Sequence, residues 1–212
     1  IDPDALRHAL TALAKESSDT GSLRKDGLRL IKAAFLAGRA TVQHAVEQDG
    51  LPGLEAARAL SALQDALIQV IYDFAVKHVY YAQNPTTAER LAIVATGGYG
   101  RGELAPGSDV DLLFVRPFKQ TAWGESVIEF ILYMLWDLGL KVGHATRSLA
   151  ECVRLGKQDI TIRTALLEAR YLWGDEALFE DLRKKFWSDI ATGNGRDFVE
   201  AKLAERDQRH AR

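Results

Sequence analysis

Two apolar runs joined by a glycine-rich turn constrain the fold of this chain more than any other feature. The runs predict strands over 91–96 and 109–115, and the second strand begins with Asp109 and Asp111. Because strand side chains alternate between faces, the two aspartates project from one face, and the apolar residues around them point into the sheet. Carboxylates this close repel each other unless a cation lies between them, so the pattern predicts a divalent-metal site.

The turn between these strands has the composition of a phosphate-binding site. Gly97 and Gly98 let backbone N–H groups approach a phosphate closely and permit positive φ. Arg101 adds a guanidinium that can pair with phosphate oxygens, and Ser108 lies at the rim of the turn. The spacing matches neither a P-loop nor a dinucleotide-binding turn. A glycine pair followed by Asp-x-Asp therefore predicts phosphate groups bound together with Mg²⁺.

Composition excludes several classes of protein. Of the 212 residues, 47% are hydrophobic and 26% charged, which is typical of a soluble globular protein. A net charge of −2 argues against a nucleic-acid partner, and the absence of a long apolar run argues against a membrane span. Cys152 is the single cysteine, which excludes an internal disulfide and fits a cytoplasmic location. The chain starts at Ile1 and stops in a charged helical pattern, so we expect a piece of a longer protein.

Hydrophobic periodicity divides the chain into three parts: a helical arm over 1–85, a core over 86–175 and C-terminal helices over 176–212. The arm breaks at 17–22 and has further helices over 23–47 and 54–82. After the second strand, the predicted elements are a helix over 122–138, a strand over 140–147 and helices over 149–155, 160–169, 176–190 and 197–212. No element is assigned to 171–175. This order predicts an α+β fold in which helices flank a small mixed sheet.

The sequence Gly97-Gly98, ten further residues and then Asp109-Val110-Asp111 resembles the signature of the polymerase-β-type nucleotidyltransferase superfamily. A longer match includes 140–147 and 164–170. It is similar to the N-terminal domain of the bacterial PII-protein uridylyltransferases, the bifunctional uridylyltransferase/uridylyl-removing enzymes. The likeness extends from about Leu23 to the end of the chain and is least specific in the helical arm.

This resemblance implies a polymerase-β-like core that transfers UMP from UTP to a tyrosine of the PII nitrogen-signalling protein and releases pyrophosphate. It implies that Asp109 and Asp111 bind Mg²⁺ and that Gly97 and Gly98 contact the triphosphate. In the family, a uridylyl-removing domain and glutamine-sensing domains follow, so we expect glutamine control to lie outside these 212 residues.

The identity of the catalytic base stays open. Many members of the superfamily carry a third carboxylate on the next strand, but here Gly143 or His144 occupies that region. His144 is a candidate base because histidine titrates near neutral pH, and a structural role is the alternative. Asp159 and Glu168 are further acids that could fold back toward the site or serve as capping or surface residues.

Three basic residues are candidate partners for the triphosphate: Arg147, Lys141 and Arg163. Arg147 is the first choice because it shares strand parity with Gly143. A solvated basic side chain is the alternative for each of them.

Two other functions stay open at this point. An adenylyltransferase, an aminoglycoside-modifying enzyme or a tRNA terminal transferase would use the same motif, although the near-neutral charge argues against tRNA. A nucleotide-binding module without catalysis is the other alternative. The intact pair Asp109 and Asp111 argues against it for the parent protein, whereas a fragment that lacks part of the active-site cover keeps it open.

Overall fold

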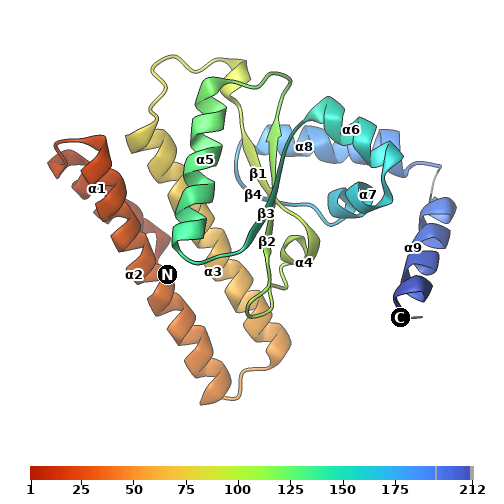
Figure 1. Ribbon diagram of the computed structural model, residues 1–212, viewed down its shortest axis with the longest axis horizontal. Helices are drawn as coiled ribbons and strands as arrows, with labels where there is room; N and C mark the ends of the chain where they lie inside the picture. The colour runs from red at the N-terminus through yellow and green to blue at the C-terminus, as the bar shows by residue number, and fades with distance from the viewer. Residues whose placement is uncertain (194, 211–212) are drawn as a thin grey trace.

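A four-stranded mixed sheet lies at the centre of the molecule, with helices packed on both of its faces (Figure 1). The structure is a computed structural model, and it describes residues 1–193 and 195–210. The strands follow the order β3-β2-β1-β4, with the bounds β1 Ala92–Ala95, β2 Val110–Arg116, β3 Val142–Ser148 and β4 Arg170–Gly174. β1 pairs antiparallel with β2 and β4, whereas β2 and β3 are parallel. The predicted α+β class is confirmed.

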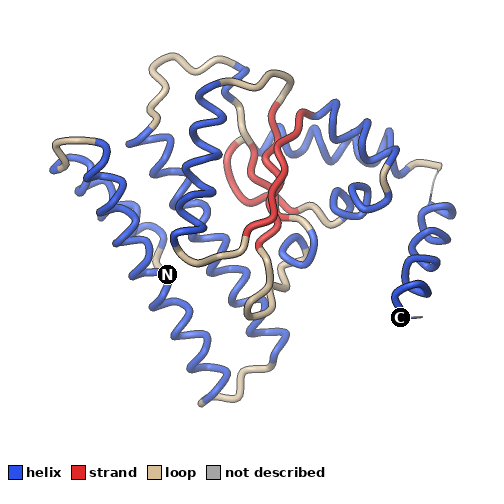
Figure 2. Tube along the Cα trace, viewed as in Figure 1, coloured by secondary structure: helices blue, strands red, loops and turns tan. Residues whose placement is uncertain are grey.

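Different helices cover the two faces of the sheet, as Figure 2 shows by the red strands between groups of blue helices. On one side lie α1 (Pro3–Glu16), α2 (Thr20–Glu47), α3 (Gly53–Phe74) and α5 (Ala122–Asp137). On the other side lie α6 (Leu149–Gln158), α7 (Ile160–Leu167) and α8 (Glu176–Lys185). The remaining helical elements are η1 (Ala75–Val79), η2 (Thr87–Glu89), α4 (Gly97–Gly100), η3 (Phe186–Ala191) and α9 (Gly195–His210).

Aspartates at the N-termini explain where the first two helices begin. Asp2 accepts hydrogen bonds from backbone N–H groups of the first turn of α1, where Pro3 needs no donor partner. Asp19 accepts a hydrogen bond of 2.9 Å from the Ser22 backbone N–H. Because this cap starts α2 at Thr20, the break between the helices is shorter than the predicted 17–22.

Side chains of the sheet alternate between two hydrophobic clusters. Those that pack toward α1–α3 and α5 include Ile93, Ala95, Val110, Leu112 and Phe114. Those that pack with α6, α8 and η3 are Ala92, Val94, Leu113 and Val115. The predicted inward orientation of the apolar residues around the two aspartates is therefore confirmed. The helical arm shares the first cluster with the sheet, and the three predicted domain ranges stay a prediction.

One helical segment, Gly53–Val79, is long and apolar enough to cross a membrane by length and composition, with a mean hydropathy of 1.3 over its best window. No such segment was expected from the sequence. The core helix of a soluble protein meets the same criteria, and 56% of this window is buried within the protein. Its apolar character is accounted for by packing against the sheet and the neighbouring helices.

Three sequence-based expectations need correction. The strand β4 was not expected, because it has only five residues and its partner β1 lies far away in the sequence. The helix predicted over 54–82 ends at Val79, where η1 closes it as a π-turn. The turn predicted over 97–108 contains the short helix α4. Of the helix predicted over 197–212, residues 211–212 lie outside the described residues.

Candidate active site

Asp111 projects from β2 toward α7 and lines a pocket of about 240 Å³. Asp109 lies one residue before the strand and is exposed. The pKa of Asp111 is raised, first by burial and then by the negative charge of Asp109. Within the described chain, neither carboxylate has a hydrogen-bond or ion-pair partner. The two acids therefore form an uncompensated negative pair on one face of the sheet.

Two glycines enclose the Asp111 carboxylate. Gly97 has φ +61°, and a Cβ built there would lie 3.0 Å from Asp111 Oδ2. Gly143 is the β3 residue paired with Asp111, and a Cβ there would overlap Asp111 Oδ1. A third carboxylate at position 143 would therefore collide with Asp111, which gives a physical reason why β3 carries no acid here.

The short helix α4 is fixed by a network that the sequence analysis did not find. Arg170 at the start of β4 donates to both carboxylate oxygens of Asp65 on α3, at 2.7 and 3.1 Å. It also donates to the carbonyls of Tyr99 and Gly100, at 3.1 and 3.3 Å, and the Tyr99 hydroxyl donates to Asp65 at 2.7 Å. A Cβ on Gly100 would overlap the Glu168 carbonyl oxygen. The glycine turn is thus held between α3 and β4.

Of the other predicted phosphate ligands, Arg147 lies four residues along β3 from Gly143, the residue that pairs with Asp111. It lines the same pocket as Asp111, and its guanidinium has no hydrogen-bond or ion-pair partner within the described residues. Arg101 is half exposed and donates to Glu168 Oε1 at 2.8 Å, so its charge is already paired. Gly98 lies in α4, and a Cβ there would meet no atom closer than 3.6 Å. Ser108 is exposed and lines a different pocket.

The remaining candidates take other positions around the aspartate pair. His144 lines the same pocket as Asp111, but it pairs with Leu112, so its ring lies on the opposite face of the sheet from the Asp111 side chain and contacts the Trp136 ring. Its candidacy as the base is not supported by this geometry. Asp159 caps α7 by accepting from the backbone N–H groups of the first turn, which also lowers its pKa.

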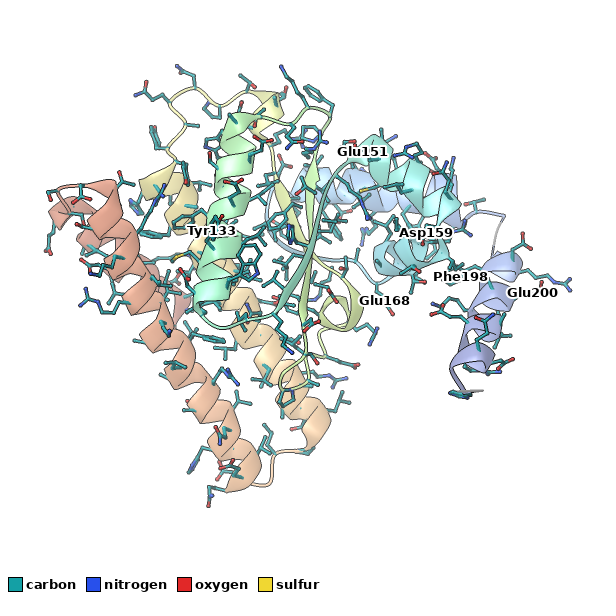
Figure 3. All side chains as sticks on the ribbon, viewed as in Figure 1. Tyr133, Glu151, Asp159, Glu168, Phe198 and Glu200 are labelled. Atoms are coloured by element: carbon teal, nitrogen blue, oxygen red, sulfur yellow. The ribbon has the colours of Figure 1, made fainter. Side chains whose placement is uncertain are left out.

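Two further cations take up structural or distant positions. Arg163 donates to the carbonyls of Gly156 and Lys157 at the end of α6, at 2.9 and 3.0 Å. Lys141 lines the same separate pocket as Ser108. Figure 3 labels Glu168 and Asp159, which both lie on the α7 side of the sheet. Arg147 is thus the predicted triphosphate partner that lines the same pocket as Asp111.

The two aspartates fit a divalent cation that is completed by other ligands. Within the described residues, no group of three or more His, Cys, Asp or Glu side chains could hold a metal ion. Mg²⁺ is commonly bound through one or two carboxylates, with water and substrate phosphates completing its coordination. Asp109 and Asp111 have no cationic partner within the described residues, and the pKa of Asp111 is raised. Two such carboxylates can bind Mg²⁺ in this way.

A mixed sheet with a glycine turn after β1 and Asp-x-Asp at the start of β2 defines a core of the nucleotidyltransferase type. The sequence model of the family described as glutamate-ammonia ligase adenylyltransferase matches residues 2–130. The chain therefore belongs to this nucleotidyltransferase family.

Several curated relatives share one name. Proteins named bifunctional uridylyltransferase/uridylyl-removing enzyme from Phenylobacterium zucineum and Caulobacter vibrioides are each 52% identical over the whole chain, and one from Rhodospirillum rubrum is 50% identical. The chain spans 23% of the length of these relatives and corresponds to their N-terminal part. The predicted resemblance and the assignment to a transferase family are thus confirmed.

Proposed function

We propose that this chain carries a Mg²⁺-dependent centre that transfers UMP from UTP to a tyrosine of the PII signalling protein and releases pyrophosphate. The observation that carries the proposal is the pair Asp109 and Asp111, which has no partner within the described residues and lies beside the glycine turn. The names of the relatives support uridylyl transfer as the reaction.

In the proposed reaction, the tyrosine oxygen forms a bond to the α-phosphorus of UTP while the bond to pyrophosphate breaks, and the hydroxyl proton passes to solvent. Asp109 and Asp111 would hold Mg²⁺, which would neutralise charge on the triphosphate. Backbone N–H groups at Gly97 and Gly98 bind phosphate oxygens, and Arg147 pairs with them across the pocket. The chain contributes mainly by positioning the substrates and compensating charge.

The proposed partners follow from the proposed transfer reaction. UTP and the PII protein are the substrates, no nucleic acid or membrane takes part, and glutamine sensing belongs to regions outside this chain. We also propose a cytoplasmic location, which is supported by a free, buried Cys152 and no second cysteine to pair with it.

The proposal is tested with α-labelled UTP, Mg²⁺ and PII. We expect label on PII, and we expect Asp109→Asn or Asp111→Asn to lower the rate by about 10²–10³-fold, because the charge that binds the metal is lost. Asp49→Asn, at an exposed acid beyond the end of α2, is the matched control and should retain the wild-type rate. Folded protein that binds neither UTP nor Mn²⁺ in calorimetry would exclude even a nucleotide site.

Adenylyl transfer is the second candidate, because the matching family is described as an adenylyltransferase. The same assay with labelled ATP in place of UTP separates the two. Transfer from ATP at a higher kcat/KM than from UTP would replace the proposed substrate while keeping the proposed site.

A further inference from the structure

A second pocket, of about 540 Å³, lies between α2, α3, the loop over 104–108 and the turn over 139–141. Val110, which points to the face opposite Asp111, forms part of its wall, so this pocket is separate from the candidate active site. In Figure 1, α2 and α3 extend together below the sheet toward their connecting loop. Protein cores pack without voids of this size, whereas ligand pockets commonly have about 300–1,000 Å³.

The walls of this pocket are mainly apolar, with Phe35, Leu60 and Leu63 among them. Gln64 also lines it and is only 2% exposed, yet its side-chain Nε2 has no hydrogen-bond partner in the described chain. A buried amide donor without a partner is unfavourable, so an acceptor oxygen supplied by an occupant would stabilise this position.

The charged side chains of this pocket favour an anion. Arg39 and Lys141 line it, and neither forms an ion pair within the described residues. Glu47 is the acid in the wall, and it accepts a hydrogen bond from Gln43 Nε2 at 2.7 Å. Two cations against one acid leave a net positive charge beside an apolar surface.

We propose that this pocket, called here the α2–α3 pocket, binds a small carboxylic acid with an apolar body. The hydrocarbon or aromatic part of the ligand packs against Phe35, Leu60 and Leu63. Its carboxylate oxygens accept from Gln64 or pair with Arg39 and Lys141 at the wall.

The loop that forms one wall of the α2–α3 pocket ends at the aspartate pair. At its start, the Leu104 N–H donates to Ser61 Oγ at 2.9 Å, which anchors the loop on α3. After it, the Val110 N–H donates to the Lys141 carbonyl at 2.8 Å. Asp109 lies between these anchors, directly after the exposed wall segment. We therefore expect occupancy of the pocket to change metal binding at Asp109, an effect that rests on the proposed function.

Binding is tested by titrating the protein with decanoate in a calorimeter, with decylamine as the oppositely charged probe. We expect saturable binding of decanoate at least about tenfold tighter than that of decylamine. The double variant Arg39→Gln, Lys141→Gln should lose about tenfold in decanoate affinity. Lys25→Gln with Arg29→Gln removes two cations of α2 that lie outside the pocket, and this matched control should bind like the wild type.

Leu60 is half-buried, so Leu60→Trp places a larger side chain in the pocket. This variant should abolish decanoate binding while its circular dichroism spectrum stays that of the wild type. Equal affinity for decanoate and decylamine, or unchanged decanoate binding in the Arg39/Lys141 or Leu60 variants, would overturn the site. Gln64→Leu gives an independent readout, since it removes the amide donor and should weaken binding about fivefold.

The coupling is measured separately as Mn²⁺ affinity with and without saturating decanoate. A change of at least about threefold supports it, and an unchanged value overturns the coupling but not the pocket. If Mn²⁺ does not bind under either condition, the proposed function fails, whereas the decanoate titration still decides the pocket.

Discussion

At the scale of single residues, the surroundings of Asp111 determine what this site can do. Its carboxylate lies between Gly97 and Gly143, where neither residue has a side chain to hinder a ligand. Burial and the charge of Asp109 both raise its pKa, which means that the folded protein disfavours the ionised form of this carboxylate. A bound cation would remove that penalty, which links metal binding directly to stability.

Gly143→Ala should weaken metal binding without unfolding the protein. The new Cβ would overlap Asp111 Oδ1, and the carboxylate would have to rotate away from its present position. We expect about tenfold weaker Mn²⁺ binding in isothermal titration, the size usual when the support of a metal ligand is disturbed. Gly53→Ala is the control, because a Cβ there meets nothing within 4 Å. Unchanged affinity in Gly143→Ala would show that Asp111 is not a ligand.

Asp111→Asn should stabilise the metal-free protein at neutral pH. A raised pKa means that the folded state binds the proton more tightly than the unfolded state, so stability falls as pH rises from the ordinary value of 3.8 through the raised value. Asparagine carries no charge, and the variant should therefore have the higher Tm above this window in EDTA. The difference should shrink as pH falls toward 3.8. Added Mg²⁺ should raise the Tm of the wild type alone.

Asp159→Asn is the control of opposite sign. Backbone hydrogen bonds at the N-terminus of α7 lower the pKa of Asp159, so its ionised form contributes stability above its unfolded pKa and loses it as pH falls. We expect this variant to be less stable than the wild type at neutral pH. A lower Tm for Asp111→Asn in EDTA would contradict the account of the site.

At the scale of elements, α4 is held in place by α3 and β4 rather than by its own length. Four residues cannot form a stable helix alone, and the turn keeps its shape because Arg170 binds Asp65 and two carbonyls of α4. The glycine turn is therefore supported by residues that do not line the pocket of Asp111. Arg170 and Asp65 are positioning residues in this sense.

Arg170→Met should destabilise the protein by about 2 kcal/mol, because it removes several charge-assisted hydrogen bonds of a partly exposed pair. Urea unfolding measures this effect. Arg183→Met removes an exposed ion pair with Glu180 and should cost less than about 0.5 kcal/mol. Equal unfolding midpoints for the two variants would refute the role of Arg170 in holding α4.

The sequence was sufficient for elements with a clear period and insufficient for contacts that depend on register. Helices over 23–47 and 122–138 were predictable because apolar residues recur at helical spacing. β4 was not, since its pairing with β1 joins segments far apart in the chain. The role of Gly143 could not be derived either, because it depends on the residue of β2 that it faces.

At the scale of the whole molecule, the sheet joins two hydrophobic clusters, and the helical arm belongs to the first of them. α9 stands apart, since none of its described residues is buried. η3, directly before it, instead contributes Phe186 and Ile190 to the second cluster. The C-terminal segments therefore differ sharply in what they contribute to stability.

Truncation after Thr192 should change the free energy of unfolding by less than about 1 kcal/mol, because the described residues that it removes are all half-buried or exposed. Truncation after Lys185 also removes Phe186 and Ile190 and should cost more than about 3 kcal/mol. Urea titrations of both truncated proteins check this. A similar loss from each would show that α9 does belong to the core.

The contact between Arg170 and Asp65 also sets an order of events during translation. The two residues are 105 positions apart, so at 5–20 residues per second the ribosome adds Arg170 about 5–20 s after Asp65. From the synthesis of β1 until that of β4, β1 has an open edge, and α4 lacks the support of Arg170. The proposed transfer centre is thus assembled late, after most of its own residues have been synthesised. Slow or paused elongation before Arg170 would prolong its exposure to aggregation and to chaperones.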